Sequence, residues 1–249
     1  MKKPVGTYNS LTDIGRIRLK NEDRAFCLPN RHGEILMGVL DGMGGANKGE
    51  VASDLALESI CGDFLKKPRT PFLFAARFWL GWALRRANAK VYKTAEGNSA
   101  YKGMGTTANI AFIYGGKALV ANVGDSRCYI LDEKGLKRLS EDQTYVSYLL
   151  RTGRIKQEEA LVHPDRHVLM NALGIYPSLS VSYYVFPYLG QTILCCTDGL
   201  YNSLPENEIE TILRMEERSD RKTALLVKLA NDAGGNDNIG VSLWEALDD

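Results

Sequence analysis

Short apolar runs and amphipathic stretches alternate along the chain and predict a mixture of strands and helices. Strand-like runs occur at residues 7–14, 24–28, 35–40, 107–114, 118–123, 128–131, 179–186, 191–197 and 239–245. Helical spacing occurs at residues 48–67, 72–95, 142–152, 205–215 and 221–233. Because hairpin turns such as Gly115-Gly116 join strands within a block, this order favours antiparallel sheets covered by helices over alternating parallel units.

The two longest predicted helices each carry large apolar side chains at helical spacing. The first places one apolar face against a sheet, formed by Val51, Leu55, Ala56, Ile60 and Phe64. The second carries a similar row, formed by Phe74, Phe78, Trp79, Trp82 and Leu84. Aromatic side chains usually pack in protein cores, so we expect the second row to face the interior and not to bind a cofactor.

Composition and charge exclude several classes of protein. The 249 residues contain no linker-like stretch or internal repeat, which favours a single domain over residues 1–249. A net charge of +1 gives no general attraction to nucleic acid or to an anionic membrane, so neither is expected as a partner. The five cysteines include no CxxC pair, which argues against a disulfide framework or a zinc knuckle. With no apolar segment long enough to span a bilayer, we expect a cytoplasmic protein.

One stretch, ILMGVLDGMGG at residues 35–45, combines a buried strand with an acid and a glycine-rich turn. Its apolar run is typical of a strand buried on both faces, and it ends abruptly at Asp41. A lone Asp-Gly is ordinary turn chemistry. The run at residues 191–197, however, also ends in Asp-Gly, at Asp198. Two acids at the ends of buried strands favour a metal site.

Further acids occupy strand ends or glycine turns along the whole chain. The full set is Glu22, Asp23, Asp41, Asp125, Asp198 and Asp237. These are oxygen ligands without a matching set of histidines or cysteines, which suits Mg²⁺ or Mn²⁺ and disfavours zinc. Arg18, just before the first two acids, is suited to bind a phosphate through two hydrogen bonds. The residues alone therefore predict a carboxylate metal site with a phosphate-binding arginine.

Seven spaced motifs follow one another over nearly the whole chain. They are Asp13-Ile14-Gly15-x-x-Arg18-x-x-Asn21-Glu22-Asp23, Asp41-Gly42-Met43-Gly44-Gly45, Gly105-Thr106-Thr107, Asn122-Val123-Gly124-Asp125-Ser126-Arg127, Ala172-Leu173-Gly174, Thr197-Asp198-Gly199-Leu200 and Gly235-Asn236-Asp237-Asn238-Ile239. In this order they resemble the metal-dependent protein serine/threonine phosphatases of the PP2C (PPM) type, in their short bacterial form. The resemblance implies an α+β fold, an α-β-β-α sandwich of two antiparallel sheets flanked by helix pairs.

The resemblance also implies a reaction and a role for each acid. The reaction is hydrolysis of phosphoserine and phosphothreonine in proteins by a metal-activated water at a binuclear site of Mn²⁺ or Mg²⁺. The implied direct ligands are Asp41, which bridges the two ions, the Gly42 carbonyl, Asp198 and Asp237. Glu22 and Asp23 are implied to hold metal-bound waters, and Arg18 to bind the phosphate. Asp125 matches a third-ion position; the alternative is a turn cap bonded to Ser126 or Arg127.

Residues from about 145 to 170 correspond to the flap of the family, which lies beside the active site and is expected to contact substrate. Its histidines, His163 and His167, are interpreted as loop residues and not as catalytic ones. Met43 stands where many eukaryotic members carry a histidine assigned as general acid, and its thioether cannot donate a proton. Further departures from the family pattern, expected to affect substrate preference and not chemistry, are Ala46, Gln143 and Asn171.

The expected partners are phosphoprotein substrates, in particular a bacterial Ser/Thr kinase and its targets, and the chain is expected to be a monomer. One alternative is a pseudophosphatase that binds phosphoproteins without turnover, although every metal-ligand position is retained. Another is a phosphatase dedicated to one regulatory partner, such as an anti-sigma-factor antagonist. The lack of an appended sensor or membrane segment argues against the second alternative.

Overall fold

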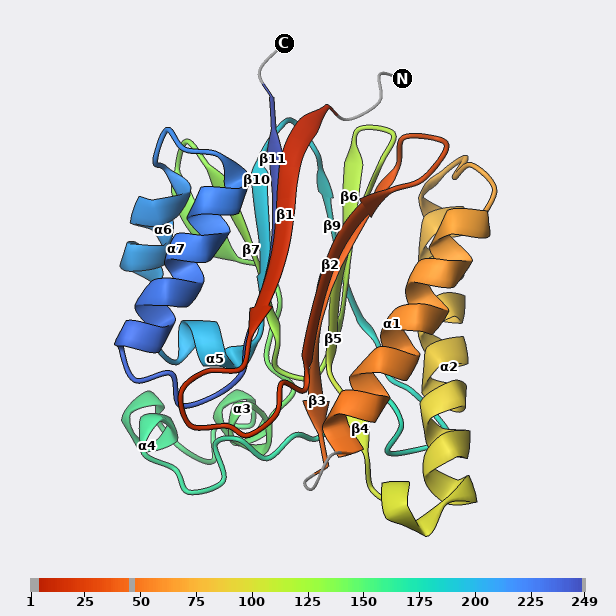
Figure 1. The fold of residues 1–249 in the computed structure, drawn as a ribbon, viewed down its shortest axis with the longest axis vertical. Coiled ribbons are helices and arrows are strands. Elements are labelled where there is room, and N and C mark those ends of the chain that lie inside the picture. Colours follow the sequence, from red (N-terminus) through yellow and green to blue (C-terminus); the bar gives the residue numbers. More distant parts are fainter. Residues whose placement is uncertain (1–4, 45–47, 248–249) are drawn as a thin grey trace.

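The computed structural model describes residues 5–44 and 48–247. Its strands form two antiparallel sheets packed face to face (Figure 1). The first sheet has the order β1 (Gly6–Asp13), β11 (Ile239–Ala246), β10 (Thr192–Cys196), β7 (Arg127–Asp132) and β8 (Gly135–Arg138). The second has the order β2 (Asp23–Pro29), β3 (Ile35–Met43), β5 (Ala108–Tyr114), β6 (Lys117–Val123) and β9 (Ser182–Pro187), and β4 (Gly105–Thr106) pairs with the end of β3.

Helix pairs cover the outer face of each sheet, as Figure 1 shows. The second sheet is covered by α1 (Lys48–Lys66) and α2 (Leu73–Gly97), and the first by α6 (Glu206–Leu213) and α7 (Ser219–Asp232). Shorter helices are the 3-10 helix η1 (Ser99–Tyr101), α3 (Tyr145–Arg151), α4 (Gln157–Leu161) and α5 (Asp198–Tyr201). This arrangement confirms the predicted α-β-β-α sandwich. None of the helices within the described residues is long and apolar enough to cross a membrane.

Strand β3 is buried on both faces, as its unbroken apolar run predicts. Ile35, Met37 and Val39 pack in the core between the two sheets. Leu36 and Leu40 point the other way, into the core beneath α1 and α2. Because side chains alternate along a strand, Asp41 continues the row of Ile35, Met37 and Val39 and faces the opposite sheet. The apolar pattern of β3 therefore sets the direction of its terminal acid.

The hairpin turn predicted at Gly115-Gly116 is also confirmed. Tyr114 pairs with Lys117 across the two glycines. Gly115 and Gly116 have φ values of 52° and 72°, the left-handed region that a two-residue hairpin loop of this type requires at both positions. Glycine is the residue that enters this region without strain, which is why the sequence signal was specific.

The prediction for the aromatic row on α2 is partly wrong. Leu84 is fully buried, and Trp79 packs against Phe64 and Phe112. Phe74, Phe78 and Trp82, by contrast, lie on the solvent side of the helix. The buried face of α2 consists mainly of small residues and leucines: Ala76, Leu80, Ala83, Leu84, Ala87 and Val91. The alanines let α2 approach α1 and the sheet closely, and they leave no room there for the three large rings.

Candidate active site

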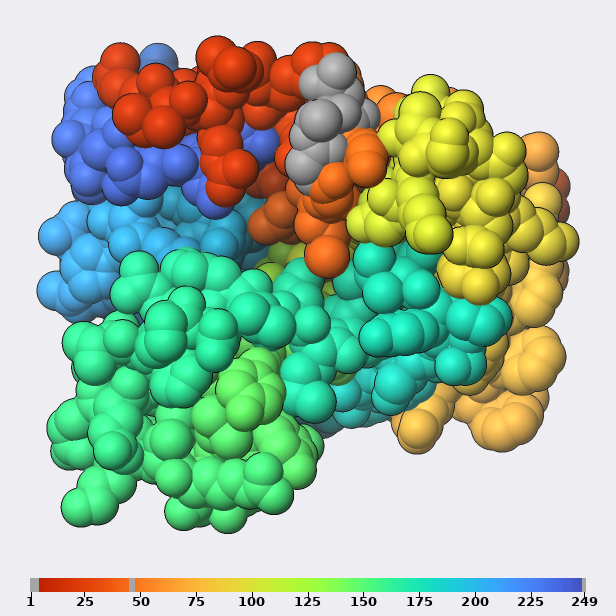
Figure 2. All heavy atoms as spheres, turned by 90° about the horizontal axis from the view of Figure 1, so that it is seen from below, coloured from red at the N-terminus to blue at the C-terminus, as the bar shows by residue number. Residues whose placement is uncertain are grey.

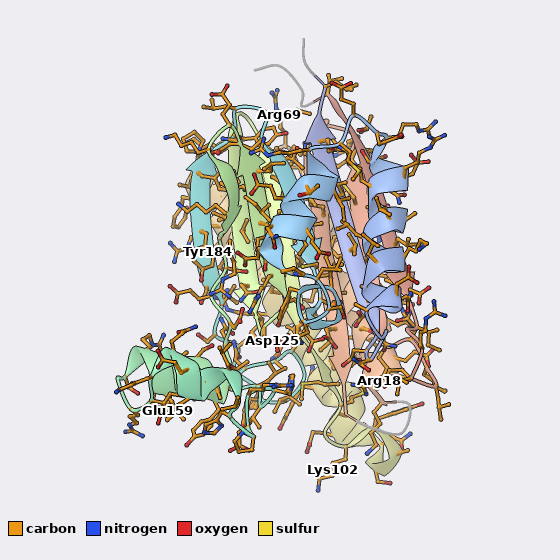
Figure 3. The ribbon with its side chains drawn as sticks, turned by 90° about the vertical axis from the view of Figure 1, so that its left-hand side faces the viewer. Arg18, Arg69, Lys102, Asp125, Glu159 and Tyr184 are labelled. Carbon is orange, nitrogen blue, oxygen red and sulfur yellow. The ribbon has the colours of Figure 1, made fainter. Side chains whose placement is uncertain are left out.

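The predicted acids converge at one end of the sandwich although they come from distant segments. Asp23 begins β2 and lies opposite Asp41 in the β2–β3 ladder. Asp198 begins α5 just after β10, and Asp237 lies just before β11; both strands belong to the first sheet. Asp125 lies in the turn between β6 and β7, and Figure 3 shows it close to the end that carries Arg18. The two sheets therefore contribute acids to one space between their ends.

The pKa values show that these acids act on one another. Burial is the main cause that raises the pKa of Asp41 well above its usual range, and the charges of Asp23 and Asp198 add to it. Burial, followed by the Asp198 charge, raises the pKa of Asp125 to about 8. Burial and the Asp237 charge raise the pKa of Asp198 to about 6, against a lowering by Arg18. Such a group of acids is stable in its ionised form only with cations beside it.

Arg18 is the cation that the chain itself places at this site. It lies in the loop between β1 and β2, and its Nη2 donates to Asp237 Oδ2 at 2.7 Å. This hydrogen bond is the main cause that raises the pKa of Arg18. With its side chain about half exposed, the guanidinium lies at the edge of the group and is accessible to a ligand. The structure thus brings Arg18 to the predicted acids.

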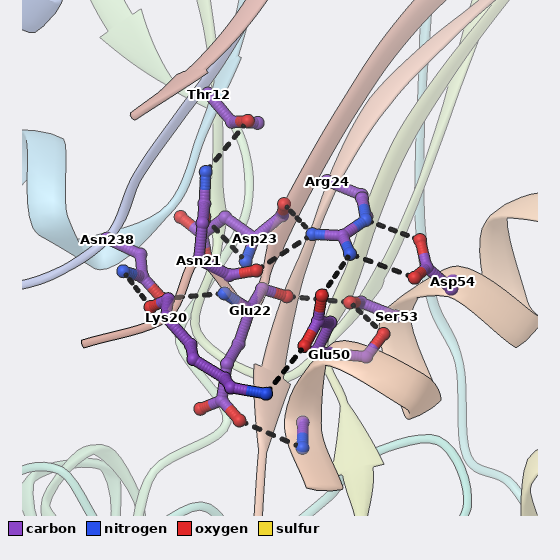
Figure 4. Close-up of polar contacts among 11 residues, drawn as sticks. Thr12, Lys20, Asn21, Glu22, Asp23, Arg24, Glu50, Ser53, Asp54 and Asn238 are labelled. Atoms are coloured by element: carbon purple, nitrogen blue, oxygen red, sulfur yellow. Dashed lines mark hydrogen bonds and ion pairs between the residues drawn. The ribbon is translucent and has the colours of Figure 1, made fainter. Parts of the chain in front are cut away.

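Glu22 and Asp23 are held by the ends of neighbouring elements, and Figure 4 shows the surroundings of Glu22. Glu22 Oε1 accepts a hydrogen bond from Gly49 N at 3.0 Å, at the N-terminus of α1. Asp23 Oδ2 accepts from Thr197 Oγ1 at 2.7 Å, and Thr197 Oγ1 in turn accepts from Gly240 N at 2.7 Å. Asp23 therefore ties the second sheet to the first directly beside Asp198. Thr197 belongs to one of the seven motifs, but the sequence analysis assigned it no role.

Gly42 occupies a position that a side chain could not share. A Cβ at Gly42 would lie 2.3 Å from the Gly49 carbonyl oxygen and 2.6 Å from that of Glu22. Glycine therefore allows β3 to pass against the start of α1, next to Asp41. Met43 follows and pairs with Gly105 in the short β4 ladder. Gly45, the last residue of the motif, and Ala46 lie outside the described residues.

The acids fit a divalent cation in the chemistry of their donors. They supply carboxylate oxygens, and the Gly42 carbonyl lies beside them; oxygen donors are the set that Mg²⁺ and Mn²⁺ prefer. Across residues 5–44 and 48–247, however, no three acidic, histidine or cysteine side chains approach one another closely enough to form a metal-binding group. In this arrangement the Asp237 carboxylate accepts a hydrogen bond from Arg18. The fit therefore rests on donor type and direction, not on ligand distances.

The residues that follow Asp125 have other partners for their side chains. Ser126 Oγ lies 2.7 Å from Thr107 Oγ1, and the Arg127 guanidinium forms two hydrogen bonds to Asp142. In the described part of the chain, neither side chain bonds the Asp125 carboxylate, and the third-ion position and the turn cap both stay predictions. The Asp125 carbonyl oxygen accepts from Tyr201 OH at 3.1 Å.

Two of the departures from the family pattern contact each other at the base of the flap. Asn171 Nδ2 donates to Gln143 Oε1 at 2.6 Å. Gln143 also bonds Gly124 twice, because its Oε1 accepts from Gly124 N and its backbone N donates to the Gly124 carbonyl, both at 3.0 Å. The pair therefore connects both ends of the flap to the residue before Asp125. Separation in sequence hid this contact.

The flap itself contains α3 and α4, where the sequence predicted one helix from 142 to 152 and an irregular stretch beyond it. Figure 2, viewed from the site end, shows the flap in green and the β1–β2 loop in red on opposite sides of this surface. His167 Nδ1 lies 4.0 Å from Asp198 Oδ2, and His163 packs edge-on against Tyr145. A cavity of about 670 Å³ lies beside the flap, lined by Arg138, Asp142, Gln143, Tyr148, Asn171 and Ser182 among others, and by none of the predicted metal ligands.

Comparisons with known proteins agree with this geometry. Residues 16–234 match the family model described as protein phosphatase 2C. The serine/threonine phosphatase stp of Listeria monocytogenes is 38% identical over 237 residues, which cover 94% of this chain and 93% of that protein. The S. agalactiae serine/threonine phosphatase superposes with a TM-score of 0.92 at 32% identity, covering 97% of this chain and all of that one.

A further solved structure bears on the cation. The catalytic domain of the serine/threonine protein phosphatase PstP, in complex with two manganese ions, superposes with a TM-score of 0.83 at 28% identity, covering 98% of this chain and 99% of that one. The two manganese ions of that structure support a divalent metal in the family. The family model, the relatives and the fold agree over nearly the full length, and we conclude that this chain belongs to the protein phosphatase 2C family.

Proposed function

We propose that this protein is a Mn²⁺- or Mg²⁺-dependent enzyme that hydrolyses phosphoserine and phosphothreonine in proteins and so opposes a Ser/Thr kinase. The observation that carries the proposal is the convergence of Asp23, Asp41, Asp198 and Asp125, from both sheets, on a space where, among the described residues, Arg18 is the only lysine or arginine that forms an ion pair with a predicted acid. Buried acids with too few cations need cations from outside. The names of the relatives, all serine/threonine or protein phosphatases, support the substrate class.

In this proposal each site residue has a distinct task. Asp41, the Gly42 carbonyl, Asp198 and Asp237 would hold the cations, and Asp125 together with Asp198 would hold a further one. When bound, the cations supply positive charge to the phosphoryl oxygens and acidify a water molecule. Glu22 and Asp23 accept hydrogen bonds from the surrounding water. Their own bonds to Gly49 N and Thr197 Oγ1 fix where their carboxylates lie.

Arg18 orients the substrate. Its guanidinium offers several N–H donors in a plane, and only one of them is engaged by Asp237. The remaining donors can bind two phosphoryl oxygens at once, which fixes the phosphoryl group against the acids. Met43 has no proton to give, so the chain provides no donor for the leaving hydroxyl at that position.

The test is phosphate release from a phosphothreonine peptide with Mn²⁺, with a chelator, and with Asp198→Ala. We expect turnover that needs the metal and is lost in the variant. The matched control is Asp132→Ala, an exposed acid at the end of β7, which should retain full activity. If the folded wild-type protein binds Mn²⁺ and the peptide but releases no phosphate, the pseudophosphatase alternative replaces this proposal.

A further inference from the structure

The segment from Phe64 to Ala95, which includes most of α2, has a composition unlike the rest of the chain. It contains no acidic residue and eight basic ones, in a chain whose net charge is +1: Lys66, Lys67, Arg69, Arg77, Arg85, Arg86, Lys90 and Lys93. All except Lys67 are exposed. The net charge of the whole chain, from which we expected no attraction to anionic surfaces, does not show this local excess of basic residues.

Large aromatic rings lie on the solvent side of the same helix. The exposed fractions are 60% for Phe72, 74% for Phe74, 67% for Phe78 and 43% for Trp82. The last three are spaced by four residues, so they form one row along α2. Together the four rings expose roughly 400–600 Å² of mainly apolar surface, about the largest patch that a soluble monomer usually shows. Such a patch normally marks a site of interaction.

Basic side chains border the row. Arg77 lies over the ring of Tyr183 at 4.7 Å, and Arg86 lies over the ring of Trp82 at 5.4 Å. Acids of α1 neutralise two of the cations, because Asp63 pairs with Arg86 and Glu58 with Lys90. Within the described residues the other five exposed cations of the segment have no carboxylate at ion-pair distance: Lys66, Arg69, Arg77, Arg85 and Lys93. We call Phe72, Phe74, Phe78, Trp82 and these five cations the α2 face.

The α2 face is separate from the proposed active site. Its aromatic half begins at Leu73, the end of α2 that lies near Arg69, and Figure 3 places Arg69 at the opposite end of the molecule from Arg18 and Asp125. Figure 1 shows α2, in yellow, on the outside of the helical layer. A surface bound to this face would leave the acids and the flap free for a substrate.

We propose that the α2 face binds an anionic lipid bilayer at its surface. Phenylalanine and tryptophan rings are suited to the depth of the lipid headgroups, and arginine and lysine bind lipid phosphates. Clusters of four to eight basic residues on a helix are typical of proteins that bind anionic lipids. The helix lies on the surface and does not cross it, in agreement with the absence of a spanning helix among the described residues.

The charges argue against a second copy of this chain as the partner. A symmetric dimer through α2 would bring the unpaired cations of both copies, among them Arg77 and Arg85, into one interface, and like charges repel. An acidic protein segment is the remaining alternative. A bilayer is favoured because the aromatic row gives the face an apolar stripe that can enter the lipid, and cations accompany it over about six turns of one helix, from Phe72 to Lys93.

The experiment is co-sedimentation of the purified protein with vesicles of phosphatidylcholine alone or with vesicles that also contain the anionic lipid phosphatidylglycerol. We expect binding to the anionic vesicles only, weakened by salt because the attraction is partly electrostatic. Phe74→Ser/Phe78→Ser and Arg69→Glu/Arg85→Glu should each reduce binding at least about tenfold. These side chains are exposed, so thermal unfolding should show that both double variants remain folded.

The matched control is Arg218→Glu/Arg221→Glu, which makes the same charge change on the exposed side of α7, on the opposite helical layer. This variant should bind the anionic vesicles within about twofold of the wild type. The proposal is overturned if the wild type does not bind, if the α7 variant loses as much as the α2 variants, or if the Phe74/Phe78 variant binds normally. Binding to polyglutamate but not to vesicles, through the same residues, would assign the face to an acidic protein.

Discussion

The two ends of the β2–β3 hairpin both contain buried acids, but only the acid at one end has a cation of the chain as its partner. At one end Glu34, directly before β3, is 5% exposed and receives three hydrogen bonds, from Lys67 Nζ at 2.6 Å, Thr70 N at 2.7 Å and Asn30 Nδ2 at 2.8 Å. At the other end Asp41 and Asp23 face each other across the ladder, next to further acids. The hairpin carries a neutralised acid at one end and unneutralised acids at the other.

The pKa values follow this difference. Burial raises the pKa of Glu34, but the hydrogen bonds from Lys67, Thr70 and Asn30 outweigh it and leave the pKa lowered. At the Asp41 end, burial and the neighbouring charges act in the same direction, and the pKa is raised. Lys67 also lies 5.3 Å from the Trp79 ring and 5.1 Å from the Phe112 ring, so its position is fixed by packing. A buried acid with an internal cation serves the fold, whereas buried acids without one are suited to bind cations from solution.

The largest effect is expected from Asp41→Asn. The change removes a charge from the acids that face each other, and turnover of a phosphothreonine peptide should fall at least about a thousandfold, or about 4 kcal/mol of transition-state free energy. Because repulsion is relieved, urea unfolding in a chelator should show a stability equal to or above that of the wild type. Near-normal turnover would exclude Asp41 as the central ligand.

At the Glu34 end the corresponding change should damage the fold instead of the activity. Lys67→Met keeps most of the side-chain volume but leaves Glu34 buried without its cation, and the free energy of unfolding should fall by about 3–5 kcal/mol. Urea denaturation measures this loss, and the folded fraction should retain its turnover. A loss below about 1 kcal/mol would show that water, and not Lys67, stabilises the Glu34 carboxylate.

The pH dependence of this loss is its control. The pKa of folded Glu34 lies below its value in the unfolded chain, so the stabilisation by the pair is complete above the usual carboxyl pKa of about 4.3. It is lost as the pH falls through the lower, folded value. The difference in unfolding free energy between the wild type and Lys67→Met should therefore be large at pH 6 to 7 and should shrink on acidification below about pH 4. A difference independent of pH would assign the loss to packing.

The sequence predicted where the site lies better than it predicted the hydrogen bonds that hold the site residues. The reason is that the first depends on local patterns and the second on residues far apart in the chain. An acid at the end of a buried strand is a local pattern, and the alternation along β3 directs Asp41 toward the other sheet. The contacts that hold the site join residues far apart in the chain. Arg18 and Asp237 are 219 positions apart, and Asp23 and Thr197 are 174 apart. Neither pairing leaves a periodic signal.

The wrong prediction for α2 has a different cause. The prediction used only the spacing of apolar residues and not their size. Apolar residues recur at helical spacing on both faces of α2, so spacing could not decide which face is buried. The face with alanines fits closely against α1, while the face with Phe74, Phe78 and Trp82 is exposed. Side-chain volume decided the orientation, and the charge pattern gave a usable signal, because the arginines accompany the aromatic row.

An intermediate effect is expected from Arg18→Ala. Loss of the guanidinium should raise KM for a phosphothreonine peptide by an amount worth about 1.5–3 kcal/mol, while Mn²⁺ affinity changes little. Arg16→Ala is the control, because Arg16 lies two residues away and pairs with Asp232 instead of a site acid. Titration with Mn²⁺ and peptide kinetics measure the two effects separately. A parallel loss of metal affinity would mean that Arg18 organises the acids and does not bind the phosphate.

The smallest effect is expected at the base of the flap, where the uncharged amide side chains of Gln143 and Asn171 bond each other. Asn171→Ala removes the hydrogen bonds to Gln143 Oε1 and to the Ser180 carbonyl, which should cost about 1–2 kcal/mol of unfolding free energy. Asn171→Asp should cost more, because two acceptor oxygens would then face each other at the present 2.6 Å contact. Its added charge would also lie near Asp125, through Gln143 and Gly124.

The comparison of the two Asn171 variants sharpens the contrast between the hairpin ends. The uncharged side chain of Asn171 should matter if the nearby acids already lack cations. In that case, when the Mn²⁺ concentration is lowered and then restored, the kcat/KM of Asn171→Asp should recover less than that of Asn171→Ala. Asn9→Ala is the control for the loss of one hydrogen bond. It removes the hydrogen bond from the Asn9 side-chain amide to Thr223, on the distant outer face of β1. Equal behaviour of the two Asn171 variants would show that the flap base contributes to stability alone, and that the charge balance of the site does not extend beyond the acids themselves.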